Sequence, residues 1–334
     1  MRALITGVGG FVGRHLLDHL LEQGDEVCGL GRAGDVGGIA AVRVFRADLA
    51  DRSAVERVMR ETQPDAVYHL AAQSSPAESL GDPWATIGNN LLAQINLFEA
   101  VLGAGLRPRV LVIGSSDEYG RVGPDEVPTH ENVPLRPTTP YAVSKVGQDM
   151  MGFQYFAQHR LPVVRVRPFN HTGPGHDARF VIPSFAQQLA EMEAGVREPV
   201  LRVGNLNVER DFTDARDMVR AYRLALVSGI PGEVYNLGRG RSTRIAEMVD
   251  ELTSMVGIPV ETRVDPALLR PSDIPKQEAD THKFTSLTGW QPRIPWHTTL
   301  RDTLDYWRRR VASTRPSAVT TPRTARWRRP IPDC

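Results

Sequence analysis

The sequence predicts an α/β fold, with a doubly wound parallel sheet and a smaller C-terminal α/β region. Two observations support this prediction. Short apolar runs alternate along the chain with stretches of helical hydrophobic spacing, which is typical of a parallel sheet covered by helices on both faces. In addition, the first apolar run, residues 2–6, ends in a glycine-rich turn and leads into a helix with leucines at helical spacing that stops at Gly24.

The glycine-rich turn, residues 7–13, has the strand–turn–helix context that a dinucleotide-binding fingerprint requires. Gly7 allows the tight turn, and Gly10 lets a pyrophosphate approach the backbone at the helix N-terminus. Gly13 lets the helix and the strand pack closely. We therefore expect this segment, with Phe11 and Val12 between the glycines, to bind a nicotinamide cofactor.

The second strand, predicted at 26–30, is followed by Gly31 and Arg32. A site for NAD usually has a carboxylate here for the ribose 2′-hydroxyl, whereas a site for NADP has an arginine for the 2′-phosphate. The strand end carries no carboxylate, so the pattern favours NADP(H) over NAD(H); the alternative is that Arg32 is a solvated loop residue. A third strand, 42–45, leads to Asp48 and Leu49, which we expect to cap the adenine.

The alternation continues with a helix at 52–62, a buried strand within 65–72, a helix at 90–104 and a strand at 109–113. Ligands of such sheets bind beyond the carboxyl ends of the strands. Besides residues 7–13, two segments bring small polar groups to this edge, namely 71–74 and 115–120.

Tyr141 and Lys145 are four residues apart, so on a helix they lie on the same face. Thr139 is a suitable N-cap and Pro140 a suitable first residue, which places the pair in the first turns of that helix. We expect the lysine ammonium to lower the pKa of the Tyr141 phenol. A phenol tuned in this way can exchange a proton with a carbonyl or alcohol oxygen.

Composition excludes several classes of protein. The chain has 334 residues, 41% of them hydrophobic and 24% charged, and a net charge of +1, so bulk charge gives no reason to expect nucleic acid or an anionic membrane as partner. Its two cysteines, Cys28 and Cys334, form neither a disulfide framework nor a metal cluster. Without an apolar span, we expect a cytoplasmic protein without a metal. Residues 312–334, rich in Ser, Thr, Pro and Arg, are expected to be a disordered tail.

With Ser115, the glycine turn and the Tyr141/Lys145 pair, the chain resembles the extended short-chain dehydrogenase/reductase family. Three longer motifs are similar to its GDP-mannose-modifying branch: Arg167-Pro-Phe-Asn-His-Thr-Gly-Pro-Gly175, Gly204-Asn-Leu with Arg210-Asp-Phe, and Leu269-Arg-Pro-Ser-Asp273. The resemblance covers about residues 1–310. It implies a Rossmann-type domain at 1–170 with a return strand near 234–238, and a nucleotide-sugar-binding region at 171–311.

The resemblance also implies roles for individual residues. Tyr141 would donate the proton, Lys145 would bind the nicotinamide ribose, and Ser115 would donate to the reacting oxygen. Further cofactor contacts would come from Leu70, Ala71, Ala72, Ser74, Pro168 and His171. The nucleotide sugar would be bound by Ser116, Asn170, Phe180, Val181, Val203, Asn205, Arg210, Arg270 and Asp273. For Arg210 and Arg270 the residues alone leave open an ion pair with Asp211 or Asp214 and a solvated loop, respectively.

Members of this branch either dehydrate GDP-mannose at carbons 4 and 6 or reduce the resulting 4-keto sugar, and reduction yields GDP-rhamnose. The dehydratases carry a Glu as extra acid–base group where this chain has Asp117, which is shorter by about 1.5 Å. Strand alternation is expected to turn Glu118 away from Ser115 and Asp117. The dehydratases also carry a Lys where this chain has Ser184. These differences favour an NADPH-dependent reductase.

Two other hypotheses remain open. One is a dehydratase or epimerase that recycles bound NADP and uses Asp117 as its acid–base group. The other is a catalytically silent nucleotide-binding subunit, which the intact Ser115, Tyr141 and Lys145 argue against. An epimerase-reductase of the fucose type is disfavoured, because 115–117 contains no Cys. The resemblance further implies a homodimer through a four-helix bundle of helices 90–104 and 141–158. The nucleotide base and the sugar are left open.

Overall fold

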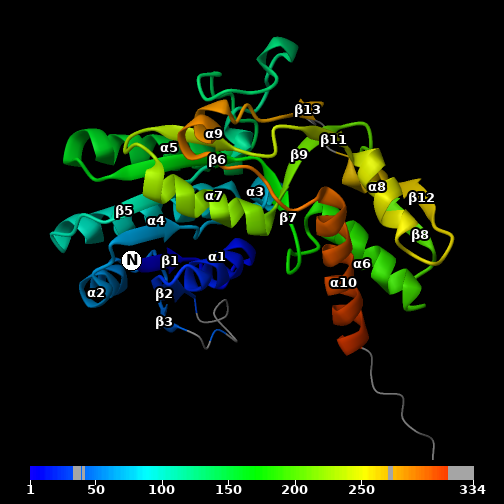
Figure 1. Ribbon diagram of the computed structural model, residues 1–334, viewed down its shortest axis with the longest axis horizontal. Coiled ribbons are helices and arrows are strands. Elements are labelled where there is room, and N and C mark those ends of the chain that lie inside the picture. Colours follow the sequence, from blue (N-terminus) through cyan, green and yellow to red (C-terminus); the bar gives the residue numbers. More distant parts are fainter. Residues whose placement is uncertain (33–38, 40–41, 270–273, 315–334) are drawn as a thin grey trace, which may run out of the picture.

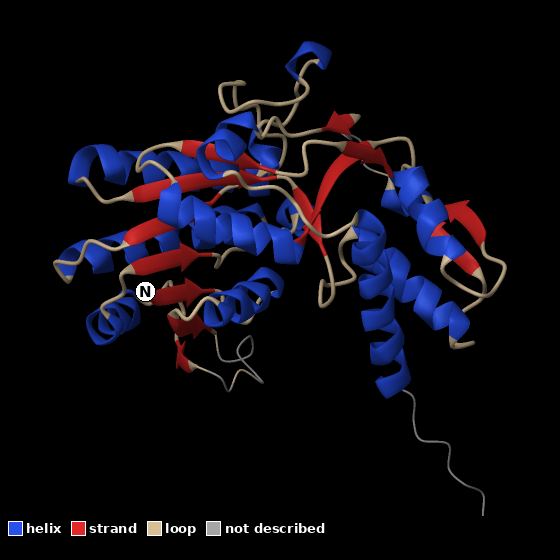
Figure 2. Ribbon diagram, viewed as in Figure 1, coloured by secondary structure: helices blue, strands red, loops and turns tan. Residues whose placement is uncertain are grey.

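The structure is a computed structural model that describes residues 1–32, 39, 42–269 and 274–314. Its larger part is a parallel sheet of seven strands in the order β10-β6-β5-β4-β1-β2-β3 (Figures 1 and 2). The strands are β1 (Arg2–Thr6), β2 (Glu26–Gly31), β3 (Arg43–Arg46), β4 (Ala66–His69), β5 (Arg109–Ile113), β6 (Val163–Pro168) and β10 (Val234–Leu237). The expected α/β fold with a doubly wound parallel sheet is confirmed.

Helices cover both faces of this sheet (Figure 1). One face packs against α1 (Phe11–Glu22) and α7 (Ala215–Ser228), and the other against α2 (Arg52–Thr62), α4 (Pro83–Gly103) and α5 (Pro140–His159). Each face has its own cluster of buried apolar side chains. Burying both faces of the strands explains why they read as continuous apolar runs.

The strand order turns at β1, which lies between β2 and β4. In open α/β sheets this switch point forms a crevice at the carboxyl ends of the strands. The segments that follow β1, β4 and β5 therefore meet at one edge of the sheet. They are residues 7–13, residues 70–74 and the 3₁₀ turn η1 (Ser116–Glu118).

The second region has a separate hydrophobic core. Its helices α6 (Val181–Glu193), α8 (Ile245–Ser254) and α10 (Trp296–Thr314) pack together, with leucines such as Leu189 and Leu304 fully buried. The strands here are β7 (Asn170–Thr172), β8 (Val200–Val203), β9 (Glu209–Asp214), β11 (Ser242–Arg244), β12 (Glu261–Val264) and β13 (Lys276–Gln277). The short helices of the molecule are α3 (Pro76–Gly81), α9 (His282–Thr288), η2 (Pro124–Glu126) and η3 (Pro266–Leu268).

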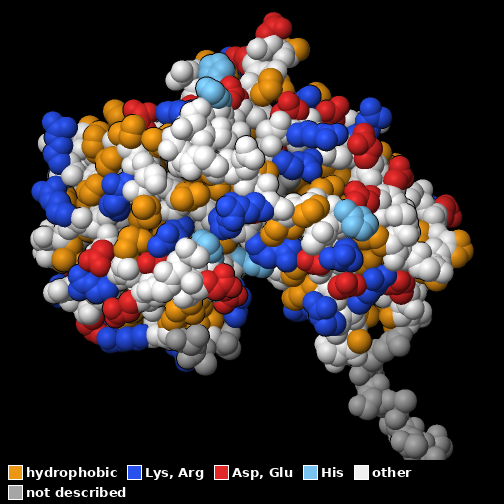
Figure 3. Space-filling view, viewed as in Figure 1, with side chains coloured by type: hydrophobic (Ala, Val, Ile, Leu, Met, Phe, Trp, Pro, Cys, Tyr) orange, Lys and Arg blue, Asp and Glu red, His pale blue; other side chains and the backbone are white. Residues whose placement is uncertain are grey.

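Strand β9 connects the two regions, because it pairs with β7, β11 and β13. β7 directly follows the large sheet's β6, so the motif 167–175 runs from one region into the other. In the space-filling view the molecule is hollowed between the two regions (Figure 3). No helix within the described ranges is both long and apolar enough to cross a membrane.

Three expectations about local structure need correction. Residues 116–118 form a 3₁₀ turn rather than an extension of the strand, since Ser115 caps it and Glu118 closes a capping box. The helix expected at 90–104 begins at Pro83, where Asp82 caps it. The expected tail at 312–334 is helical in α10 as far as residue 314, and its remainder lies outside the described residues.

Candidate active site

The glycine turn forms a cradle of backbone atoms at the N-terminus of α1. A Cβ on Gly13 would lie 2.3 Å from the Gly7 carbonyl oxygen, and a Cβ on Gly7 would lie 2.9 Å from the Ala71 Cα. Gly7 also has a φ of +72°, which favours glycine. No side chain caps this end of α1, because its N-cap is Gly10. The first amides of the helix therefore suit the diphosphate of a dinucleotide.

The segment after β4 lies against this cradle. The Thr6 hydroxyl accepts a hydrogen bond from the Ala71 amide at 3.2 Å and also bonds His69 Nδ1 at 2.9 Å. Leu70, Ala71 and Ala72 are half-buried there, and Ser74 is exposed. The structure thus brings residues 7–13 and 70–74 together, as a cofactor site at the switch point requires.

The residues expected around the adenosine end lie at the ends of β2 and β3. Arg32 directly follows β2 and is exposed. The Asp48 carboxylate accepts the Ala50 amide at 2.8 Å, while the Leu49 side chain is buried in the hydrophobic core. Among these residues, Arg32 is the cation at the strand end, where a 2′-phosphate would lie.

Ser115, Tyr141 and Lys145 meet at the same edge of the sheet. Thr139 caps α5 through its hydroxyl, which accepts the Ala142 amide at 3.1 Å, and Pro140 is the first helical residue. Ser115 caps the 116–118 turn and lies close enough to Tyr141 to influence the pKa of its phenol. Lys145 Nζ lies 6.0 Å from the centre of the Tyr141 ring and donates to the Ile113 carbonyl at 2.8 Å. The predicted N-cap and the predicted grouping are confirmed.

The expectation that Lys145 lowers the pKa of Tyr141 is wrong. Burial, together with the charge of Asp117, raises the pKa of Tyr141, and the neighbouring Ser115 side chain only partly opposes this. Burial also lowers the pKa of Lys145 to about 8. The physical reason is desolvation, which disfavours both charged forms in this enclosed position. The raised pKa favours the neutral phenol of Tyr141.

Asp117 and Glu118 lie on opposite sides of the 3₁₀ turn. Glu118 is fully buried, and its carboxyl accepts the Ser115 amide at 2.7 Å. Asp117 is half-buried and accepts a hydrogen bond from Gln277 Nε2 at 3.3 Å. The Asp117 and Glu118 side chains point apart, as expected, but the 3₁₀ turn and not the alternation of a strand separates them. Glu118 is therefore committed to the interior.

Gln277 is a site residue that sequence reasoning missed. It lies in β13, 160 residues from Asp117, and is 7% exposed. While its amide nitrogen donates to Asp117, its oxygen accepts from Asn170 Nδ2 at 3.4 Å. Gln277 thus bridges the 116–118 turn and the 167–175 motif. No local pattern signals this role, because it depends on the pairing of β13 with β9.

The expected substrate residues fall into three groups. Asn170 and Arg210 lie near the junction of the two regions. Arg210 Nη1 donates to the Ile274 carbonyl at 2.7 Å. Asp214, one of the two carboxylates considered as an ion-pair partner of Arg210, forms an ion pair with Arg216. Phe180 is the N-cap residue of α6, next to Val181, which is 38% exposed. The Phe180 ring stacks on His176, and the His176 ring stacks on Phe11 with 4.2 Å between the ring centroids. The remaining positions are as follows: Ser116 and Val203 are buried, Asn205 accepts the Asn207 amide, and Arg270 and Asp273 lie outside the described residues.

The last two expected cofactor residues lie where β6 leads into β7. Pro168 ends β6 and is buried. His171 Nδ1 bonds the Phe169 carbonyl at 3.2 Å, and its ring is parallel to Phe11 at 6.4 Å. His171 therefore faces Phe11 of the glycine turn across the sheet edge.

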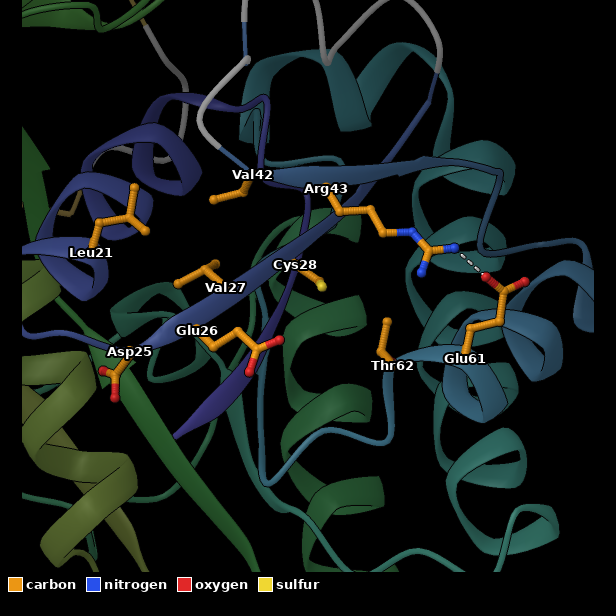
Figure 4. Close-up of a pocket in the computed structure, with 9 residues that line it drawn as sticks. All are labelled: Leu21, Asp25, Glu26, Val27, Cys28, Val42, Arg43, Glu61 and Thr62. Carbon is orange, nitrogen blue, oxygen red and sulfur yellow. Dashed lines mark hydrogen bonds and ion pairs between the residues drawn. The ribbon is translucent and has the colours of Figure 1, made fainter.

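A cavity of about 390 Å³ lies away from all these groups, next to the Arg43–Glu61 ion pair and the amino-terminal part of β2 (Figure 4). Its lining includes the half-buried Cys28, whose pKa burial raises. It shares no residue with the catalytic group. Within the described ranges, no three His, Cys, Asp or Glu side chains are grouped so as to hold a metal ion.

Comparisons with known proteins agree with this geometry. The family model for GDP-mannose 4,6 dehydratase matches residues 4–303. A GDP-6-deoxy-D-mannose reductase from Pseudomonas aeruginosa is 34% identical, over 93% of this chain and 98% of its own length. A UDP-glucose 4-epimerase from Mycolicibacterium smegmatis is 30% identical, over 92% and 99%.

Among solved structures, that of RMD from Pseudomonas aeruginosa complexed with NADPH is similar, with a TM-score of 0.82 and 32% identity over 93% of this chain and 100% of that one. The resemblance inferred from the motifs is confirmed. The chain belongs to the GDP-mannose 4,6-dehydratase family of nucleotide-sugar enzymes, within the extended short-chain dehydrogenase/reductases.

Proposed function

We propose that the protein is an NADPH-dependent reductase of the 4-keto group of a GDP-4-keto-6-deoxy-hexose, which converts GDP-4-keto-6-deoxy-D-mannose to GDP-D-rhamnose. The observation that carries this proposal is the grouping of Ser115, Tyr141 and Lys145 at the sheet edge next to the glycine turn, with Lys145 Nζ 6.0 Å from the centre of the Tyr141 ring. Reduction of a ketone needs a proton donor, and a phenol at this place can supply one. The similarity to a GDP-6-deoxy-D-mannose reductase supports the same reaction.

The dinucleotide would be held by the backbone of residues 7–13 and 70–72, with Arg32 at the 2′-phosphate. The close approach of Gly7 and Ala71 leaves a smooth backbone surface for the diphosphate. When bound, the cofactor supplies a hydride to the keto carbon. The similar RMD structure is a complex with NADPH, which supports the same cofactor here, in agreement with the arginine at the end of β2.

Ser115 and Tyr141 would manage the charge that develops on the keto oxygen. As the carbon gains the hydride, the oxygen becomes an alkoxide, and two hydroxyl donors stabilise it. Tyr141 then gives its proton to that oxygen, and the product is the neutral alcohol. Lys145, within 6.0 Å of the Tyr141 ring, stabilises the phenolate that remains.

The nucleotide sugar would lie along the junction of the two regions. Asn170 and Gln277 would approach the sugar, because they lie next to Asp117. Arg210 would bind the diphosphate with Arg270, since a guanidinium forms paired hydrogen bonds with phosphate oxygens. In this proposal residues 1–170 with strand 234–238 bind the cofactor, and 171–311 bind the substrate.

A second candidate is a 4,6-dehydratase that keeps its NADP and recycles the hydride. One observation favours it: the Asp117 carboxylate is close enough to Tyr141 for its charge to raise the phenol's pKa. In that reaction Asp117 would remove the proton at carbon 5. Against it, Asp117 accepts a hydrogen bond from Gln277, which stabilises the carboxylate where it is.

The deciding experiment follows NADPH absorbance with GDP-4-keto-6-deoxy-mannose, beside a sample with GDP-mannose and no reductant. Stoichiometric loss of NADPH with the keto sugar supports the reductase. A 4-keto product from GDP-mannose without NADPH loss would instead establish the dehydratase. If neither sample reacts, a panel of UDP, CDP and TDP keto sugars tests the nucleotide.

We also propose that two copies form a homodimer through α4 and α5. Both helices leave large apolar side chains partly exposed: Leu92 and Ile95 on α4, and Val143, Met150 and Phe153 on α5, each 39–47% exposed. Pairing these faces would bury them in a four-helix bundle. Light scattering that shows only a monomer would contradict this arrangement.

A further inference from the structure

A buried group of charged side chains lies directly beneath the catalytic turn. We call it the Glu118 network: Glu118, Arg167, Asp149 and Arg165. The side chains of Glu118 and Asp149 are 0% and 1% exposed, and that of Arg167 is 4% exposed. Two carboxyl groups and two guanidinium groups are thus almost completely removed from water, where an unpaired charge would be costly.

The network holds Ser115 through its main chain. Glu118 Oε1 accepts the Ser115 amide at 2.7 Å, and the Ser115 carbonyl accepts the Glu118 amide at 3.1 Å. The carboxyl passes over Gly114, where a Cβ would lie 2.2 Å from Glu118 Oε1. Gly114 is therefore part of the arrangement, because any side chain there would displace the carboxyl.

The same network holds the helix that carries Tyr141 and Lys145. Asp149 follows Lys145 by four residues on the same side of α5. Its Oδ2 accepts from Arg167 Nη2 at 2.5 Å and from Arg167 Nε at 2.8 Å. Arg167 Nε also donates to Glu118 Oε2 at 3.1 Å. A single guanidinium on β6 therefore joins the Ser115 turn to α5.

Neighbouring contacts leave this guanidinium little freedom. Arg167 Nη1 donates to the Tyr119 hydroxyl at 3.0 Å, and that hydroxyl donates to Asn236 on β10 at 2.6 Å. Burial and the charge of Asp149 raise the pKa of Glu118, while Arg167 and Arg165 outweigh burial and lower the pKa of Asp149. The opposite directions of these two pKa shifts mean that Glu118 holds its proton more tightly than Asp149 does.

We propose that Glu118 is a positioning residue, which sets the place of the Ser115 hydroxyl relative to Tyr141 by tying the 116–118 turn to α5 through Arg167 and Asp149. Buried ion networks often stabilise a fold less than apolar residues of the same volume would. Fixing reactive groups relative to each other is a gain that such a network does provide. The inference rests on Ser115 and Tyr141 acting as in the proposed function.

The test compares Glu118→Gln and Glu118→Leu in whichever nucleotide-sugar reaction the wild-type protein catalyses. Leucine removes the acceptor for the Ser115 amide, and we expect kcat to fall about 100-fold, the effect of a displacement of about 1 Å in an active site. KM and the Kd for NADPH should change little. Glutamine keeps an acceptor oxygen of the same shape, so its kcat should be much closer to wild type than that of the leucine variant.

A matched control separates positioning from stability. Asp217 on α7 is another buried carboxylate and is 1% exposed. It accepts hydrogen bonds from the Arg293 and Ile294 backbone amides, each at 2.8 Å. Asp217→Asn should lower Tm while leaving kcat unchanged. If Glu118→Leu lowers kcat no more than this control does, the proposal is overturned.

Two further results complete the test. If Glu118→Leu does not fold, Asp149→Asn loosens the same tie from the side of α5 and should give the same fall in kcat at constant KM; unchanged kcat would overturn the proposal. Failure of the proposed function is distinguished beforehand. If the proposed function is wrong, the wild-type protein will not reduce GDP-4-keto-6-deoxy-mannose. The Glu118 variants are then compared with the substrate that the nucleotide panel identifies.

Discussion

The cofactor cradle and the catalytic rim are built in different ways, although they share one edge of the sheet. The cradle is a continuous run of backbone, residues 7–13, shaped by glycines that exclude a Cβ. The rim is assembled from side chains on η1, α5 and β13, which hydrogen bonds hold across long stretches of sequence. The cradle should therefore fail when bulk is added, and the rim when a polar atom is removed.

The largest effect is expected at the rim, from removing the proposed proton donor. Tyr141→Phe keeps the ring and loses the hydroxyl, so kcat should fall by about 10²–10⁴. Cofactor binding should remain near that of wild type, because the cradle does not involve the phenol. A steady-state assay of NADPH absorbance measures kcat, and a fluorescence titration with NADPH measures its Kd. Retained turnover would mean that the proton comes from another group.

Adding bulk to the cradle should give the next largest effect. Gly13→Ala puts a Cβ 2.3 Å from the Gly7 carbonyl oxygen and 2.8 Å from Val8 backbone atoms, so the turn must shift. We expect a loss of about 1–3 kcal/mol in the free energy of unfolding and a clear loss of NADPH affinity. Calorimetry and the same titration measure both.

The control for Gly13 is Gly257→Ala, outside the proposed dimer helices, where a Cβ would meet nothing within 4 Å. Alanine restricts the unfolded chain more than glycine does, so this variant should be as stable as wild type or more stable by up to about 1 kcal/mol. If Gly13→Ala were as stable and as active as Gly257→Ala, the close approach of the turn would have no role in cofactor binding.

A smaller effect is expected from Gln277, which joins the rim to the substrate motif. Gln277→Leu removes the donor to Asp117 and the acceptor for Asn170. Losing a hydrogen bond to a charged group costs about 1.5–3 kcal/mol, and we expect this mainly as an increased KM for the sugar. Gln187→Leu is the control, because Gln187 bonds Glu191 on the surface of α6. Equal KM values for the two variants would exclude Gln277 from the site.

The same contrast explains what could be predicted from the sequence. Gly7, Gly10 and Gly13 are adjacent in the chain, and Tyr141 and Lys145 are one helical turn apart, so local spacing predicts them. Gln277 has no such signal, because strand pairing brings it to Asp117. For the pKa of Tyr141 the sequence predicts the wrong direction, since local reasoning sees the nearby lysine and misses burial. The stacking of Phe180 on His176 has no local signal either, while its expected contact with the nucleotide stays a prediction.

The most modest effect concerns pH, and it distinguishes Lys145 from Tyr141. Burial lowers the pKa of Lys145 to about 8, whereas the pKa of Tyr141 is raised. As pH rises through 8, the lysine loses the charge that stabilises the Tyr141 phenolate, while the phenol itself stays protonated. We therefore expect kcat/KM to fall above about pH 8, which a pH–rate profile measures. A profile that is flat to pH 10 would contradict this assignment.

The stability of the cofactor-free protein gives an independent check with a definite sign. The ordinary pKa of lysine is 10.5, so between pH 8 and 10.5 the unfolded chain binds more protons at this position than the folded one. Stability then increases with pH across that window. Lys145→Met removes the titration, so the stability of wild type relative to this variant should rise from pH 8 to 10.5. A constant difference would mean that Lys145 keeps its proton in the folded protein, and that the alkaline limb of the activity belongs to another group.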